Sequence, residues 1–315
     1  MEIKRLENGM TLTHDPASQT EWKLEQRFAS WGEFVNYVDT NEPEPLTVRG
    51  LATGRSSHDD SREKLSFTGT RDWKQAMEMA RIGWKSGALD MKIALDNFKG
   101  TLPTRNLVKE TKYAMVGPGV VNFDRYQQGH PMLWKTTKKR WEDDSENGKI
   151  VHIAFGASVS GAVDVSTIMK RGAVIVALVD LLEQAGKRVQ LTIKTGTAEG
   201  GNLKYHSQCA ITVKQPDQQI DLSTLAFAVA HPSSFRRLQF AWEELAPAWF
   251  REATRCYQLN GESQGYGYVT SFRLEDDNGV LNIPAINSKD YDTKASQLKF
   301  IEESLASQGV VWESE

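Results

Sequence analysis

The chain has 315 residues, of which 25% are charged, and a formal net charge of −3; this length allows one large domain or two ordinary ones, and the charge gives no general attraction to nucleic acid or acidic lipid. The two cysteines, Cys209 and Cys256, lie far apart without metal-type spacing, which argues against a zinc site and a disulfide scaffold. The chain does not open with a signal-peptide pattern and contains no stretch of eighteen apolar residues, so we expect a cytoplasmic protein with no membrane partner.

Helix-end signals predict three helices in the first third of the chain. Ser30 and Glu33 have capping-box spacing, and the helix they begin should stop at a proline-containing stretch. Thr70 is the predicted N-cap of a second helix, which Gly83 ends. The amphipathic stretch 88–98 predicts a third helix that pairs with the second.

A basic stretch with large rings follows a predicted edge strand at 132–134. Cations that alternate with aromatic rings suit a surface that pairs with phosphates and stacks bases. The alternative is a solvated segment whose charges are balanced by the acidic residues at 142–146. The candidate nucleic-acid-binding residues are Trp134, Lys135, Lys138, Lys139, Arg140 and Trp141, with Arg236 and Arg237 as a second small basic site.

The acidic polar stretch 143–148 predicts a boundary. We expect a mixed α+β part over 1–148 and an α/β part over 149–315. In the second part, a strand at 150–155, a long amphipathic helix that Gly186 ends and a strand at 189–193 form a βαβ unit. The expected fold is therefore α/β, a mixed, mostly parallel sheet with flanking helices.

Further elements are expected along the C-terminal part. A glycine-rich turn at 195–202 leads to a strand antiparallel to its predecessor, because the connection is too short for a parallel crossover. The following apolar segment is ambiguous between strand and helix. The expected elements are a strand at 205–214, the ambiguous segment 222–230 capped by Asp221, and a helix at 235–245 that Ser233 begins. Strands at 266–274 and 280–286 around a turn at 276–279, and a helix at 294–307, are expected to follow.

The turn after the first strand of the βαβ unit stands where open α/β folds keep their ligands. Its residues Gly156 to Gly161 include hydroxyls but no carboxylate, and no lysine of a Walker A motif. Neither Ser158 with His231 nor Cys209 with His206 lies in a recognisable nucleophile motif. The patterns therefore do not favour an enzyme, and no cofactor is expected.

Over 149–312, the order strand, serine turn, long helix, strand and antiparallel strand resembles a von Willebrand factor A-like domain. That family binds a divalent cation with an Asp-x-Ser-x-Ser loop, and the matching residues here run from Gly156 to Ser160. Glycine occupies the Asp position, and the hydroxyls of Ser158 and Ser160 are poor replacements for a carboxylate. The resemblance thus implies a degenerate loop without metal, whose hydroxyls cap backbone groups.

A second similarity is carried by the segments 66–70 leading to Gly83 and Trp84, 121–134, 170–186 and 230–240. In these segments the chain is similar to an uncharacterised protein family of tailed bacteriophages. The similarity implies a viral protein in the cytoplasm of an infected host cell, and it supplies no activity.

Two functions are consistent with these features. The first is a non-catalytic, phage-type binding or scaffolding protein that acts through protein–protein contacts, with exposed tryptophans as anchors. The second is a single-stranded nucleic-acid-binding factor in viral transcription or replication.

Overall fold

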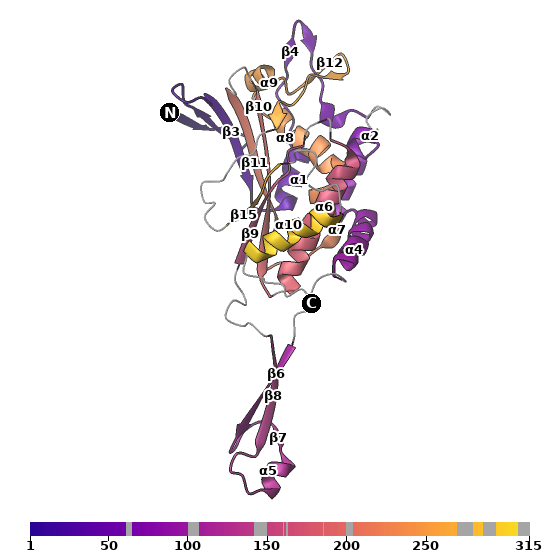
Figure 1. Ribbon diagram of the computed structural model, residues 1–315. Helices are drawn as coiled ribbons and strands as arrows, with labels where there is room; N and C mark the ends of the chain where they lie inside the picture. Colours follow the sequence, from indigo (N-terminus) through magenta and orange to yellow (C-terminus); the bar gives the residue numbers. More distant parts are fainter. Residues whose placement is uncertain are drawn as a thin grey trace.

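A mixed sheet, to which the described residues contribute eight strands, forms the centre of the protein (Figure 1). The structure is a computed structural model that describes residues 1–60, 65–99, 107–141, 150–159, 161, 163–184, 186–199, 204–269, 280–285 and 294–307. The strand order is β1-β2-β3-β11-β10-β9-β15, and β14 pairs with β10. The strands are β1 (Glu2–Arg5), β2 (Thr11–His14), β3 (Trp22–Phe28), β9 (Ile150–Gly156), β10 (Arg188–Glu199), β11 (Tyr205–Lys214), β14 (Tyr268–Val269) and β15 (Val280–Ile283).

The predicted βαβ unit is present. Strands β9 and β10 are parallel neighbours joined through helix α6 (Val165–Gln184), and Gly186 after the helix has a φ of 80°. Strand β11 is antiparallel to β10, as expected. The pairs β9–β15 and β3–β11 are also parallel, whereas the pair β11–β10 between them is antiparallel. The fold is therefore α/β with a mixed sheet.

Two expectations for the strands were wrong. Strand β10 continues through Glu199, where a glycine-rich turn was expected to begin at Thr195, because β11 supplies a paired residue at each position there. Strand β15 does not form a hairpin with the strand before it but pairs in parallel with β9. The turn expected at 276–279 lies outside the described residues.

The two parts expected on either side of residue 148 contribute to the same sheet. Strands β1 to β3 come from the first part, and β3 pairs with β11 of the second. Leu24 and Phe28 of β3 belong to the same buried apolar cluster as Leu191 of β10. The boundary residues themselves lie outside the described residues.

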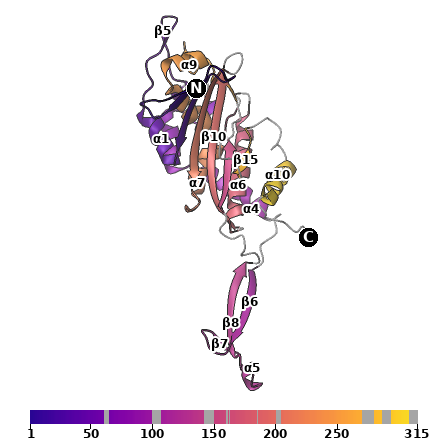
Figure 2. The same ribbon diagram turned by 90° about the vertical axis from the view of Figure 1, so that its left-hand side faces the viewer.

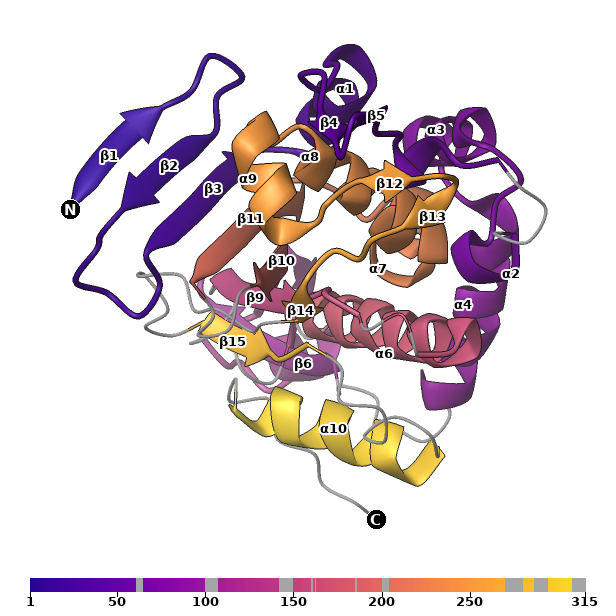
Figure 3. The same cartoon turned by 90° about the horizontal axis from the view of Figure 1, so that it is seen from above.

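A layer of helices covers one face of the sheet (Figures 1 and 3). Along β10, Val189, Leu191 and Ile193 are buried toward these helices, whereas Gln190 and Thr192 between them are half-buried. This alternation is typical of a sheet with one covered face. The helices are α1 (Trp31–Thr40), α2 (Leu65–Thr68), α3 (Trp73–Ile82), α4 (Lys85–Lys99), α6, α7 (Leu222–Ala230), α8 (Phe240–Glu244), α9 (Ala248–Thr254) and α10 (Lys294–Ser307), with a 3₁₀ turn at Ser56–His58 and a π-helical segment at Ser234–Gln239.

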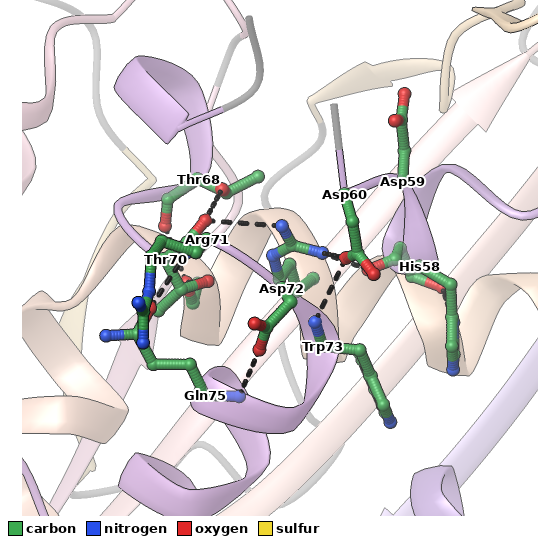
Figure 4. Close-up of polar contacts among 12 residues, drawn as sticks. His58, Asp59, Asp60, Thr68, Thr70, Arg71, Asp72, Trp73 and Gln75 are labelled. Atoms are coloured by element: carbon green, nitrogen blue, oxygen red, sulfur yellow. Dashed lines mark hydrogen bonds and ion pairs between the residues drawn. The ribbon is translucent and has the colours of Figure 1, made fainter. Parts of the chain in front are cut away.

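Most predicted helix ends are confirmed. The Ser30 hydroxyl accepts a hydrogen bond from the Glu33 amide at 3.1 Å, and Gly83 ends α3 with a φ of 85°. The N-cap of α3 is Asp72, however, whose carboxylate accepts from the Gln75 amide at 2.7 Å (Figure 4). Thr70 cannot cap this helix because its hydroxyl is buried 2.7 Å from that of Ser233.

A separate hairpin projects from the body (Figures 1 and 2). We call residues 107–141 the arm. It is a three-stranded sheet of β6 (Leu107–Ala114), β7 (Val120–Val121) and β8 (Trp134–Trp141), with a short helix, α5 (Phe123–Gln127), near its tip. Two smaller hairpins, β4 (Thr47–Val48) with β5 (Leu51–Ala52) and β12 (Gln258–Leu259) with β13 (Glu262–Ser263), complete the described strands.

Candidate functional site

The serine turn after β9 is hydrogen-bonded to the neighbouring strand, β10. The Ser158 hydroxyl accepts a hydrogen bond from the Gly196 amide at 2.7 Å and donates to the Gly196 carbonyl at 3.0 Å. The Ala157 amide donates to the Lys194 carbonyl at 2.7 Å. In this arrangement Ser158 satisfies backbone groups of β10. Ser160 lies outside the described residues.

Gly156 lies in close contact with another segment. A Cβ atom at this position would lie 2.6 Å from the amide nitrogen of Ala285 and 3.0 Å from the carbonyl carbon of Pro284. A carboxylate at position 156 would therefore displace the chain that follows β15. Among the described residues, no three His, Cys, Asp or Glu side chains gather as ligands for a metal ion.

A cavity of about 440 Å³ lies beside this turn, where β9 ends and β10 continues. Strand β10 pairs with β9 as far as Lys194 and with β14 only from Thr197. Thr195 and Thr197 of β10 and both residues of β14 line the cavity. Its lining includes Ser158, Thr195, Thr197, Phe235, Arg236, Gln239, Phe240, Glu243 and Tyr266.

Glu243 is a buried carboxyl group in the wall of the cavity. Its oxygens lie 3.0 Å from the Thr197 hydroxyl, 3.3 Å from the Ser207 hydroxyl and 3.7 Å from the Cys256 sulfur. Burial among these uncharged groups raises the pKa of Glu243 to about 8. At neutral pH the group is therefore mostly protonated and can donate a hydrogen bond.

The neighbouring Glu244 has different surroundings. It accepts hydrogen bonds from the Ser57 amide and from Arg55 Nε, each at 3.0 Å, and from the hydroxyls of Ser57 and Tyr266. The two adjacent carboxyl groups thus differ in their hydrogen-bond partners. Glu244 has a cationic partner, Arg55, whereas Glu243 has only hydroxyl and thiol partners among the described residues. The sequence analysis missed this pair, although two glutamates between Trp242 and Leu245 in an apolar helix are a visible signal.

The predicted basic stretch forms most of β8. Trp134 is half-buried and Lys135 is exposed. The backbone positions of Lys138, Lys139, Arg140 and Trp141 pair with β6, and their side chains lie outside the described residues. The register places Lys139 opposite Lys109 and Lys135 opposite Tyr113. The candidates on β8 therefore lie together along one strand of the arm.

Arg236 and Arg237 do not form a basic surface, contrary to expectation. Arg236 is 3% exposed and Arg237 is fully buried. Arg236 donates to the carbonyls of Phe67 and Val163 at 2.9 and 2.6 Å. They lie in the π-helical segment between α7 and α8, which turns both guanidinium groups inward.

The Arg237 guanidinium joins the segments that precede α3. It donates to the carbonyls of Ser57 and Thr70 at 2.9 and 3.3 Å. The Asp60 carboxylate lies 3.4 Å from it and accepts from the Trp73 amide at 3.2 Å (Figure 4). Arg237 therefore holds the loop at 56–60 against the start of α3, and its charge is not available to a phosphate.

The tip of the arm exposes a cluster of large apolar side chains. The exposed fraction runs from 41% for Val121 to 84% for Val116. The rings of Phe123 and Tyr126 stack with centroids 6.1 Å apart. The tip cluster consists of Met115, Val116, Val120, Val121, Phe123, Tyr126 and Met132.

A family profile described as "Domain of unknown function (DUF7192)" matches residues 15–310. The chain belongs to this family. The match runs through the sheet, the helices and the arm, so the family's domain includes both parts of the chain. Neither the curated proteins nor the solved structures contain a match to it. No helix in the described part of the chain is long and apolar enough to cross a bilayer.

Proposed function

We propose that the protein is a non-catalytic binding or scaffolding protein whose arm contacts a protein partner. The observation that carries this proposal is the tip cluster, seven large apolar side chains exposed at the end of a projecting hairpin. Contiguous exposed apolar surface commonly marks an interaction site. Aromatic residues and Met are enriched in protein interfaces, and Phe123 and Tyr126 are the candidate anchors.

The position of the cluster supports this proposal. Within the described residues, the buried apolar clusters of the body contain none of the tip side chains. Packing of the core therefore does not explain why these apolar side chains are present at the tip. At the base of the tip, Arg125 stacks over the Tyr113 ring at 3.7 Å and donates to the Met132 carbonyl at 3.5 Å. These contacts orient the tip on the end of the ribbon.

A matched set of variants tests the proposal. The tip variant combines Phe123→Ser and Tyr126→Ser, and the control combines Leu89→Ser and Ile93→Ser, two exposed apolar residues of α4. In affinity capture from host lysate with nuclease present, the unmodified chain and the control should retain a defined protein that the tip variant loses. Retention of that protein by the tip variant would contradict the proposal.

Single-stranded nucleic-acid binding is the second candidate. Its support is the register of the arm, which brings Lys109 and Lys139 together and sets Lys135 beside Tyr113. Replacing Lys138, Lys139 and Arg140 with Glu should abolish salt-sensitive DNA or RNA binding if this candidate is right. Lys4→Glu with Arg5→Glu, on the exposed strand β1, is the matched control.

We further propose that the C-terminal part is a degenerate von Willebrand factor A-like domain and that the protein is of phage type, acting in the host cytoplasm. The domain assignment is supported by the order β9, α6, β10, β11, with β11 antiparallel to β10. The phage assignment rests on the sequence segments quoted above. An experimental structure with a different order of these elements would remove the first assignment.

A further inference from the structure

We propose that the arm of one copy of this chain docks on the body of a second copy, with its tip cluster in a groove beside helix α3. The body is here the chain outside residues 107–141. The inference rests on the proposed function, in which the arm contacts a protein, and it names that protein.

The arm has no core of its own. Of its side chains that the structure describes, at 111–137, none is buried. A small sheet needs a covered apolar face to be stable in water, because an isolated hairpin is only marginally stable. Figures 1 and 2 show the arm extending away from the body of its own chain, so that body does not supply the cover. A segment that always needs cover favours a partner that is always present, and a second copy is such a partner.

The net charges of the arm and of the body are opposite. The arm contains seven Lys or Arg and two Asp or Glu, a net charge of +5, so the rest of a chain of net charge −3 carries −8. This difference attracts the arm of one copy to the body of another and makes two arms repel each other. The charges of the tip itself, Asp124 and Arg125, cancel. Docking of the arm on a body is therefore favoured over packing of one arm against another.

A groove of about 590 Å³ beside α3 offers the tip an apolar surface. Met79, Ile82 and Trp84 form its apolar lining, and charged side chains of both signs border it. Ile82 is 57% exposed, whereas Met79 and Trp84 are half-buried against the core. An apolar centre with a polar rim is the usual composition of a protein interface. The stacked rings of Phe123 and Tyr126 are the part of the tip that we place in this groove.

Sedimentation equilibrium of the nuclease-treated full chain tests the inference. The chain should associate reversibly above its monomer mass of 35.4 kDa between about 1 and 100 μM. Raising the salt from about 50 to 500 mM should weaken this association at least about tenfold, because salt screens the attraction between arm and body. A monomer at about 100 μM, or association that salt does not weaken, would overturn the inference. If the tip variant still loses a protein captured from lysate in that case, only this inference falls and the proposed function stands.

Two variants then locate the contact. The tip variant described above keeps the groove, and a groove variant, Met79→Gln with Ile82→Gln, keeps the tip. Each variant alone should be monomeric, and their equal mixture should form a one-to-one dimer, because one intact tip meets one intact groove. The control with the two α4 substitutions should associate as the unmodified chain does. Association of the groove variant alone, or a mixture that stays monomeric, would overturn the assignment.

Discussion

At the scale of single residues, the clearest consequences concern buried titratable groups. Glu243 could not be assigned from its neighbours in sequence, since its pKa is raised by burial in a site that Thr197, Ser207 and Cys256 reach from other parts of the chain. The sequence does reveal Ser158 as a turn residue, and its two hydrogen bonds to Gly196 have that local character. Sequence reasoning misses the raised pKa of Glu243, because the residues that surround this carboxyl group are distant in the sequence.

Glu243 should make stability fall as the pH rises. Its pKa is about 8 in the folded protein and 4.5 in the unfolded chain, so the folded state holds more protons between these values. The stability contributed by this group is complete below about pH 4.5 and is lost as the pH rises to 8. Urea unfolding from pH 5 to 8 should show that Glu243→Gln removes this decline. An unchanged decline in the variant would contradict the assignment.

His231 should make stability fall as the pH decreases. Desolvation lowers its pKa to about 4, and its ring accepts from the Ser233 amide at 3.1 Å while stacking on Phe227. Below pH 6.5, His231 becomes protonated in the unfolded chain but stays neutral in the folded protein. The free energy of unfolding therefore decreases as the pH falls toward 4. His231→Asn keeps an acceptor for the amide and should reduce this acid destabilisation. The measurement is the difference between the urea unfolding midpoints at pH 7 and pH 5. His58→Asn serves as a second variant, because the pKa of His58 is also lowered to about 4.

At the scale of elements, α6 and α7 cross unusually closely. A Cβ atom on Gly172 would lie 2.1 Å from the Cβ atom of Ala230. Gly172→Val should therefore destabilise the protein by about 1–3 kcal/mol or more through overpacking. Ala173→Val, one position along the same helix and half-buried, is the control and should cost less. Equal unfolding midpoints for the two variants in chemical denaturation would contradict this account.

Helices were easier to predict than strand partners. Ser30 with Glu33, Gly83, Asp221 and Gly186 mark helix ends through interactions with the next few residues, and each lies at a helix end in the structure. The pairing of β3 with β11 joins segments far apart in sequence, and no local pattern encodes it. The same holds for the π-helical segment, which placed Arg236 and Arg237 inside.

At the scale of the whole molecule, the shared sheet predicts that the body unfolds as one unit. The buried apolar cluster includes Phe28 and Phe34 from before the arm and Leu191 and Ile211 from after it. Fragments 1–148 and 149–315 expressed separately should therefore fail to fold, and the full chain should give one cooperative transition in calorimetry. Independent folding of either fragment would support two domains.

The arm should be dispensable for stability. Leu107 and Trp141 are paired at its base, so a short Gly-Ser linker can replace residues 107–141. The shortened protein should keep a thermal midpoint within a few degrees of the full chain, because the described core contains no arm residue. A large drop in the midpoint would show that the arm belongs to the folding unit.

The most direct test of the central claim is hydrogen–deuterium exchange on the full chain with and without its captured protein partner. Amides at 113–134, the tip of the arm, should become protected in the complex, and the strands of the main sheet should exchange as in the free protein. Protection confined to the body, with the arm unchanged, would contradict the proposal that the arm is the binding device.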